Sequence, residues 1–269
     1  MNNEYQLQNL ISKFKVYQMH MKDIWQDYNY LQQTIKSTKL RDMEIESLFN
    51  HTKKLKRARN LSGRKSSFLS YNNGKSHFID AIITFEQFIY YLSKENFKHF
   101  PKKLGKEPMH AKKLMTLIYD QEDANTIIER IIEEKNRGIF YGNPIDIFTK
   151  DPCKFQVKNF FKDNYTQELT LFSEVIARRN IVIHNDSRVD SKYIKETKRT
   201  DIVNGQKMII NSDYLKGTII LLLGLSAELL SVYLKNNYNY EASPLSILGK
   251  TKRKFKRASN SSSLDEWLK

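Results

Sequence analysis

The stretch TIILLLGLSA, residues 218–227, is the longest apolar run in this chain of 269 residues. It lies between Lys216 and Glu228 and is far shorter than the about 20 apolar residues that a membrane-spanning helix requires. We therefore predict that a helix over 213–236 is buried inside a protein core, where other helices cover it. No membrane span is expected.

Helical spacing dominates the rest of the chain, because apolar side chains recur three and four residues apart. Further helices are predicted over residues 2–36, 39–58, 77–94, 109–119, 121–137, 153–162 and 165–184. Gly138 is expected to end the helix over 121–137. No alternation of strands and helices is present, so the predicted fold class is all-α, a helical bundle.

One segment departs from the helical pattern. DIVNGQKMII, residues 201–210, places Asn204 and Gly205 between two short β-like runs. This arrangement is typical of a hairpin with a type I′ turn. We therefore expect the bundle to carry a small β-hairpin insert.

Composition divides the chain into four parts. Residues 1–60 are expected to form an N-terminal helical extension. Residues 61–75 are expected to be a linker, because NLSGRKSSFLSYNNGK (60–75) is rich in Gly, Ser and Asn. The main helical domain is assigned to 76–240, and residues 241–269 are predicted to be a basic, flexible tail because they lack sustained periodicity.

The string NNGKS, residues 72–76, has the ending of a phosphate-binding loop. That motif needs a glycine five positions before Gly74, and Leu69 stands there. We therefore reject a nucleotide site at Lys75, and we expect Ser76 to cap the next helix instead.

The formal net charge of +15 is concentrated in two short segments. Residues 53–65 hold seven Lys and Arg, residues 250–257 hold six, neither contains an acid, and the remaining chain carries only +2. Such runs suit a polyanion through counterion release, although a solvated linker and tail explain them as well.

The single Cys153 excludes an intramolecular disulfide and a multi-cysteine metal site. The first twenty residues lack the features of a secretory signal, so we expect a cytoplasmic protein. No metal site and no cofactor is predicted.

The helix over 165–184 carries an arginine on its apolar side. With about 100° per residue, Phe172, Val175, Ile176, Val182 and Ile183 share one arc, and Arg179 falls inside it. A guanidinium stays protonated and is costly to bury alone. The apolar face must therefore open at Arg179 onto an anion, a carboxylate partner or a second subunit.

Asn180 and His184 lie one helical turn apart near the edge of the same arc. An imidazole can take the proton from a ribose 2′-OH, and a guanidinium can hold the phosphate oxygens as charge builds on them. This trio suits RNA cleavage without a metal. The alternative is structural: His184 would face the helix dipole and Arg179 would pair with Glu168.

The string RRNIVIHND followed by VDSKYI resembles the signature of the HEPN superfamily, R-x-x-x-x-H with a polar residue after the arginine. It is similar to the RiboL-PSP-HEPN and MAE-like bacterial groups, in which H-N-D-G-x-V and then a Tyr follow. The likeness covers residues 76–240. Two positions depart from it: Ser187 stands where glycine is usual, and Asp186 replaces the tyrosine of the H-x-Y toxins, so regulation by a nucleotidyltransferase is not implied.

The resemblance implies a HEPN-like helical bundle that acts as a metal-independent endoribonuclease. It further implies a homodimer with a composite cleft, a toxin or anti-phage defence setting, and an antitoxin or other defence protein as partner. The implied catalytic residues are Arg179, Asn180 and His184. The residues expected to bind RNA are Arg178, Lys192, Tyr193 and Lys195.

Two other functions stay open on the sequence. A catalytically inactive module could bind a nucleotide, RNA or a protein partner through the same residues. A purely structural helical adaptor with basic arms is the third alternative.

Overall fold

The computed structural model describes residues 3–37, 56–105, 115–116, 119, 123–141, 143 and 145–268. Most of these residues are helical, and none of them belongs to a β-strand. The elements are α1 (Asn3–Ser37), α3 (Lys56–His99), η1 (Pro101–Leu104), α5 (Ala124–Tyr141), α6 (Asp146–Thr149), α7 (Phe160–Asn164), α8 (Thr166–His184), α9 (Ser191–Thr197), α10 (Ser212–Tyr238), α11 (Ile247–Asn260) and α12 (Ser263–Trp267). The predicted all-α class is confirmed, while the finer likeness to a HEPN bundle stays a prediction.

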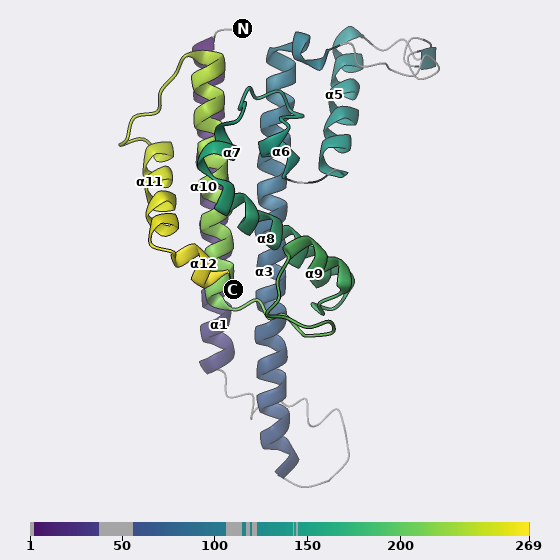
Figure 1. The fold of residues 1–269 in the computed structure, drawn as a ribbon, viewed down its shortest axis with the longest axis vertical. Helices are drawn as coiled ribbons and strands as arrows, with labels where there is room; N and C mark the ends of the chain where they lie inside the picture. Colours follow the sequence, from purple (N-terminus) through teal and green to yellow (C-terminus); the bar gives the residue numbers. More distant parts are fainter. Residues whose placement is uncertain are drawn as a thin grey trace.

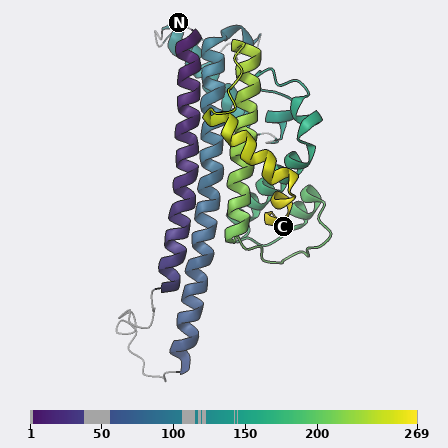
Figure 2. The same cartoon turned by 90° about the vertical axis from the view of Figure 1, so that its left-hand side faces the viewer.

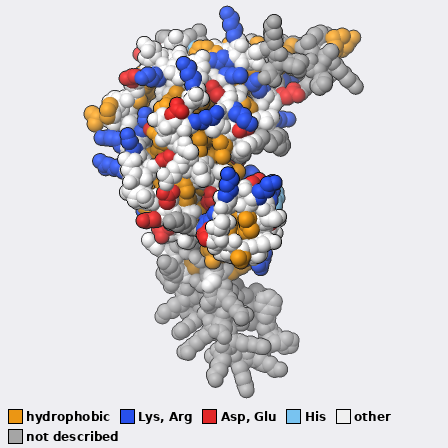
Figure 3. Space-filling view, in the orientation of Figure 1, with side chains coloured by type: hydrophobic (Ala, Val, Ile, Leu, Met, Phe, Trp, Pro, Cys, Tyr) orange, Lys and Arg blue, Asp and Glu red, His pale blue; other side chains and the backbone are white. Residues whose placement is uncertain are grey.

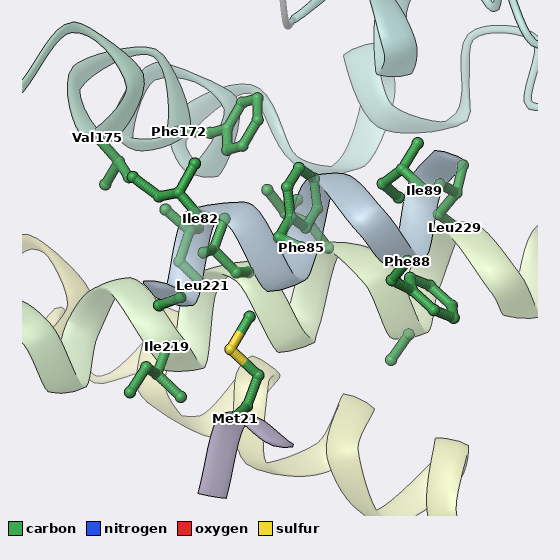
Figure 4. Close-up of a cluster of buried hydrophobic side chains, with 14 of the residues drawn as sticks. Met21, Ile82, Phe85, Phe88, Ile89, Phe172, Val175, Ile219, Leu221 and Leu229 are labelled. Atoms are coloured by element: carbon green, nitrogen blue, oxygen red, sulfur yellow. The ribbon is translucent and has the colours of Figure 1, made fainter. Parts of the chain in front are cut away.

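Three long helices, α1, α3 and α10, run side by side and form the body of the protein (Figures 1 and 2). Their facing side chains make one apolar core, to which α8 contributes Phe172 (Figure 4). Met21 of α1, Phe85 and Phe88 of α3 and Leu229 of α10 meet there, each almost fully buried. The helices predicted over 2–36, 165–184 and 213–236 are therefore confirmed.

The N-terminal helix is part of this core and not a separate extension. On α1, Tyr17 stacks on Phe88 of α3 with 4.6 Å between the ring centroids. Its hydroxyl also accepts a hydrogen bond of 3.3 Å from Ser226 of α10. Because α1 packs against both α3 and α10, removing it would expose the apolar core of the described bundle.

The expected linker over 61–75 is wrong, because these residues continue α3 without a break. Gly74 lies where the backbone of Ile210 crosses the helix, and a Cβ there would come within 2.3 Å of the Ile210 carbonyl oxygen. Asn73 is buried and donates to the Tyr28 carbonyl at 3.1 Å. Gly74 and Asn73 thus serve close packing, and Ser76 lies inside the helix and caps nothing.

The expected flexible tail is also wrong. Residues 247–260 and 263–267 form α11 and α12, which pack on α10 (Figure 2). Leu248, Phe255 and Leu264 are each only 1% exposed. The apolar periodicity is weak in the sequence because apolar residues are few here, and four of the six positions between Leu248 and Phe255 carry Lys or Arg.

The expected β-hairpin over 201–210 is wrong as well. A turn does occur at Gly205, whose φ of +83° favours glycine. The extended run after that turn, however, pairs with the residues after α8: Met208 donates to the Ser187 carbonyl at 2.8 Å, and one isolated bridge joins Arg188 to Lys207. Sequence spacing cannot reveal this longer-range partner.

Smaller differences concern the middle of the chain. Gly138 lies within α5, which continues to Tyr141, and does not end it. The short helix predicted near 153–162 is α7, which begins later. The helices predicted over 39–58 and 109–119 lie mostly outside the described residues.

The central helix α10 is long and apolar enough to cross a membrane by length and composition. However, 78% of its most apolar window is buried inside the protein. The core helix of a bundle has the same length and composition, and α10 packs as such a helix in the described structure.

Gly224 is expected to be required for the docking of α11. A Cβ at this position of α10 would come within 2.1 Å of the Phe255 ring. Gly224→Ala should therefore lower the free energy of unfolding by about 1–3 kcal/mol, the usual cost of overpacking. Urea unfolding followed by circular dichroism measures it.

Gly138→Ala is the matched control, since no atom lies within 4 Å of a Cβ at this helical position. It should raise stability by about 0.5–1 kcal/mol. Equal effects of the two substitutions would contradict the described packing of α11.

Candidate functional site

Helix α8 is buried on two faces rather than one. Phe172 and Val175 point into the main core. Ala177 and Ile181 contribute to a second, smaller apolar cluster, which the segment after α8 completes. The members from that segment are Val189, Tyr193, Ile202 and Met208, with Ile194 beside them. The second cluster fixes the chain after the motif against the C-terminal half of α8.

Arg178 lies between these two apolar faces and is only 2% exposed. Its Nε donates to Glu174 Oε1 at 2.8 Å, and its Nη2 lies 2.7 Å from the same oxygen. The guanidinium also stacks on the ring of Tyr214, 3.9 Å from the centroid. The prediction that Arg178 binds RNA is therefore wrong: this arginine is an internal structural cation.

Two tyrosines complete the surroundings of Glu174. The Tyr214 hydroxyl donates to Oε2 at 2.6 Å, and the Tyr193 hydroxyl donates to Oε1. Tyr193 is 1% exposed, so the prediction that it binds RNA is wrong for the same reason as for Arg178. We call Glu174, Arg178, Tyr193 and Tyr214 the buried network; it joins α8, α9 and α10.

The protonation states in the buried network follow from its contacts. Burial alone would lower the pKa of Arg178, but Tyr214, Glu174 and Tyr193 together raise the pKa above its ordinary value. Burial raises the pKa of Tyr214 well above its ordinary value, and it also raises the pKa of Tyr193. Both phenols therefore stay protonated and able to donate at neutral pH.

Arg179, the next residue, has a different environment. Its side chain is 30% exposed, and Nη2 lies 3.9 Å from Oε2 of Glu86 on α3. Nη1 donates to Asn180 Oδ1 at 3.4 Å, and the buried Nε has no hydrogen-bond partner among the described residues. Of the three environments expected for Arg179, the structure supplies the carboxylate partner, although at the limit of ion-pair distance.

The acid near Arg179 is not the one that sequence spacing suggested. Glu168 lies near the start of α8 and accepts a hydrogen bond from Ser259 of α11. Burial raises the pKa of Glu86, and Arg179 opposes that rise. Glu86 was missed because it lies on another helix, and no signal in the sequence places it opposite Arg179.

His184 is the last residue of α8, and its side chain is exposed. In the part of the chain that the structure describes, its ring forms no recorded hydrogen bond. The structure thus brings Arg179 and Asn180 into contact within one chain, while His184 stands apart from them and open to solvent. The imidazole is not enclosed by its own chain.

The chain turns sharply after His184. Asp186 and Ser187 have φ values of +46° and +61°, the left-handed region that favours glycine. Ser187 is held there by a 2.8 Å hydrogen bond from the hydroxyl of Tyr71 on α3. A serine is therefore accommodated at this position through a specific partner.

Asp186 gathers two lysines from separate segments. Lys75 of α3 and Lys207 each lie 3.5 Å from its carboxylate, and Lys207 stands over the Tyr71 ring at 4.3 Å. The positive charge of Lys207 holds the pKa of Asp186 below its ordinary value, and the charge of Lys75 adds a smaller effect in the same direction. Lys75, at which the sequence excludes a phosphate-binding loop, instead helps to stabilise the turn after the motif.

The remaining predicted RNA-binding residues are on α9. Lys192 and Lys195 are exposed, and Lys192 lies 3.8 Å from Glu196. Asp190 caps α9 by accepting from the Tyr193 backbone amide at 2.7 Å. The lysines therefore face solvent on the outer side of a short helix whose inner side carries the buried Tyr193.

Comparisons with family models, curated proteins and solved structures gave no match to this chain. Among the described residues, no group of three His, Cys, Asp or Glu side chains could hold a metal ion. Chemically, the site offers an accessible imidazole and a weakly paired guanidinium five residues apart on the same helix. The first can move a proton, and the second can bind a phosphate that displaces Glu86.

The two neighbouring arginines should differ sharply in their effect on stability. Arg178→Met leaves the Glu174 carboxylate buried without its cation and should cost about 3–5 kcal/mol. Arg179→Met, at a half-exposed and weakly paired position, should cost at most about 1 kcal/mol. Urea unfolding measures both values.

A double variant separates loss of the charge pair from loss of packing. Glu174→Gln combined with Arg178→Met removes both charges and should recover part of the loss seen in Arg178→Met. Equal costs for the two single arginine variants would contradict the assignment of Arg178 as the internal cation.

Proposed function

We propose that this protein is a metal-independent endoribonuclease whose catalytic residues are Arg179, Asn180 and His184. The observation that carries the proposal is that the end of one helix holds both an exposed imidazole and a guanidinium that its own chain leaves incompletely bound. The motif shared with the HEPN superfamily supports the same assignment.

In this mechanism the RNA phosphate takes the place of Glu86 beside Arg179. His184 accepts the proton of the ribose 2′-OH, and the 2′-oxygen then attacks the phosphorus. The bond from phosphorus to O5′ breaks, and a protonated imidazole returns a proton to O5′. The products are a 2′,3′-cyclic phosphate and a 5′-hydroxyl end, while Arg179 stabilises the charge on the nonbridging oxygens.

A homodimer would supply the second imidazole that one chain lacks. One imidazole cannot be both the base and the acid in the same step, and His184 of a second copy can take the other role. Ile183, beside His184, is 43% exposed, and Ile209 is 60% exposed. These apolar side chains suit contact with a second copy. A toxin or anti-phage setting, with an antitoxin or other defence protein as partner, belongs to the same proposal.

The second candidate is an inactive module that binds RNA or a nucleotide. Glu86 favours a module without cleavage, because its carboxylate lies in the position beside Arg179 that the reacting phosphate would need. In that case RNA would bind and remain intact.

Cleavage in the presence of EDTA tests the proposed reaction. The wild-type protein should produce 2′,3′-cyclic phosphate ends from labelled RNA, and His184→Ala and Arg179→Ala should each reduce the rate at least about 100-fold, a usual effect of losing such a group. His20→Ala on α1 is the control, since His20 is also exposed but remote from the motif in sequence. An equal rate in wild type and His184→Ala would sink the ribonuclease assignment.

Glu86→Gln tests whether the carboxylate competes with phosphate for Arg179. Removing the negative charge should strengthen RNA binding by about 1 kcal/mol, or about five-fold. The measurement is fluorescence anisotropy with labelled RNA in a His184→Ala background, which prevents cleavage. The same substitution in an Arg179→Ala background should have no such effect, and an equal gain there would mean that Glu86 acts independently of Arg179.

A further inference from the structure

Helix α11 has one apolar side, and that side is fully covered. Phe255 packs over Gly224 of α10, and its ring lies 5.7 Å from that of Tyr165 in a stacked arrangement. Leu248 and Ala258 are buried on the same side. The position and rotation of α11 about its axis are therefore fixed by packing.

The opposite side of α11 is strongly basic. Its exposed cations are Lys250, Arg253, Lys254, Lys256 and Arg257. We call these five residues the α11 basic face; Lys and Arg side chains line the edge of the molecule over α11 in Figure 3. Lys252 differs from them, because it lies 3.1 Å from Glu228 of α10.

The charge of the α11 basic face is not neutralised within the described structure. Helix α11 contains no acidic residue, and none of the five cations lies within 4.0 Å of a carboxylate among the described residues. A favourable contact with the helix dipole explains only Arg257, which lies in the last turn. The other four cations have no such partner among the described residues, so they are available to an external anion.

A shallow hollow lies within this surface near the end of α11. It has a volume of about 450 Å³ and is lined by Arg253, Lys256, Arg257, Asn260 and Ser261. Two guanidinium groups can bind phosphate oxygens in pairs, while the amide of Asn260 can donate a further hydrogen bond. The hollow thus matches a phosphate group of a polymer that continues along the helix.

An anionic membrane is the other surface that attracts such a helix. Helices that lie on membranes insert an exposed apolar face among the lipids. The apolar face of α11 is buried against α10, and the exposed Leu245 lies before the helix begins. A nucleic-acid backbone needs only the cations, so it is the occupant that the structure favours.

We propose that the α11 basic face is a second RNA-binding surface, which holds the phosphodiester backbone without reading its bases. Choosing RNA as the polymer rests on the proposed function. The surface belongs to a different helix from the motif: in Figure 1, α11 and α9 lie on opposite sides of α10. It therefore serves to hold substrate and takes no part in the chemistry.

Contacts with α8 connect the two surfaces. Ser259 of α11 donates to Glu168 near the start of α8, and Arg179 follows on the same helix. The rise along α8 from residue 168 to 179 is about 16 Å. At about 3.4 Å per stacked nucleotide, a separation of this size corresponds to several nucleotides. Short oligonucleotides can occupy only one of the two surfaces.

The experiment measures RNA binding with a triple variant, Arg253→Gln, Lys256→Gln and Arg257→Gln, in the His184→Ala background. For a labelled 20-nucleotide oligouridine, Kd should rise at least ten-fold, and the slope of log Kd against log salt should fall by about 2, or about 0.7 per lost phosphate contact.

A charge-matched control removes Lys13, Lys15 and Lys22 of α1 by the same Gln substitutions, and its binding should stay near that of the parent. Circular dichroism checks that all variants are folded. If the α11 triple variant binds the 20-nucleotide RNA as the control does, the proposal is overturned. If vesicles of phosphatidylcholine and phosphatidylglycerol lose binding to this variant while RNA does not, the surface docks a membrane and the proposal is again overturned.

The binding result tests the α11 basic face whether or not the protein cleaves RNA. Weakened binding by the α11 variant together with an inactive wild-type protein would retain the RNA surface and reject the nuclease. Cleavage that is unaffected by the α11 variant, with unchanged RNA affinity, would reject the surface and retain the nuclease.

Discussion

The buried ion pair between Glu174 and Arg178 is the contact on which this part of the protein depends. An unpaired charge inside a protein costs several kcal/mol, so neither residue is stable there without the other. The carboxylate is satisfied only when Tyr193 and Tyr214 donate to it as well. These tyrosines belong to α9 and α10, so the ion pair couples the docking of three helices.

Apolar spacing predicted the long helices because each of them has an apolar stripe wide enough to be recognised. It failed where tertiary contacts decide the structure. Gly74 and its small neighbours indicated a linker, yet they allow the backbone of Ile210 to cross α3. Gly224 has the same role beneath Phe255, and this fit between two distant residues turns a predicted tail into a docked helix.

The candidate site was predicted in part. The sequence placed Arg179, Asn180 and His184 on one helix end, and α8 has the expected bounds. It assigned Arg178 to the surface because only one apolar face of the helix was counted; the second face forms when the chain after α8 folds back. Neighbouring helix positions differ by about 100°, so an inward Arg178 leaves Arg179 directed toward α3 and Glu86.

The same helix fixes the relation between the motif and the α11 basic face. One end of α8 is held to α11 through the contact between Glu168 and Ser259, and the buried network holds its C-terminal half. A helix held near both ends cannot rotate or slide without breaking one of these contacts. The separation along α8 between the contact with α11 and Arg179 is therefore fixed at about 16 Å. Under the two proposals, an RNA bound on α11 reaches Arg179 only if it is long enough to span this fixed separation.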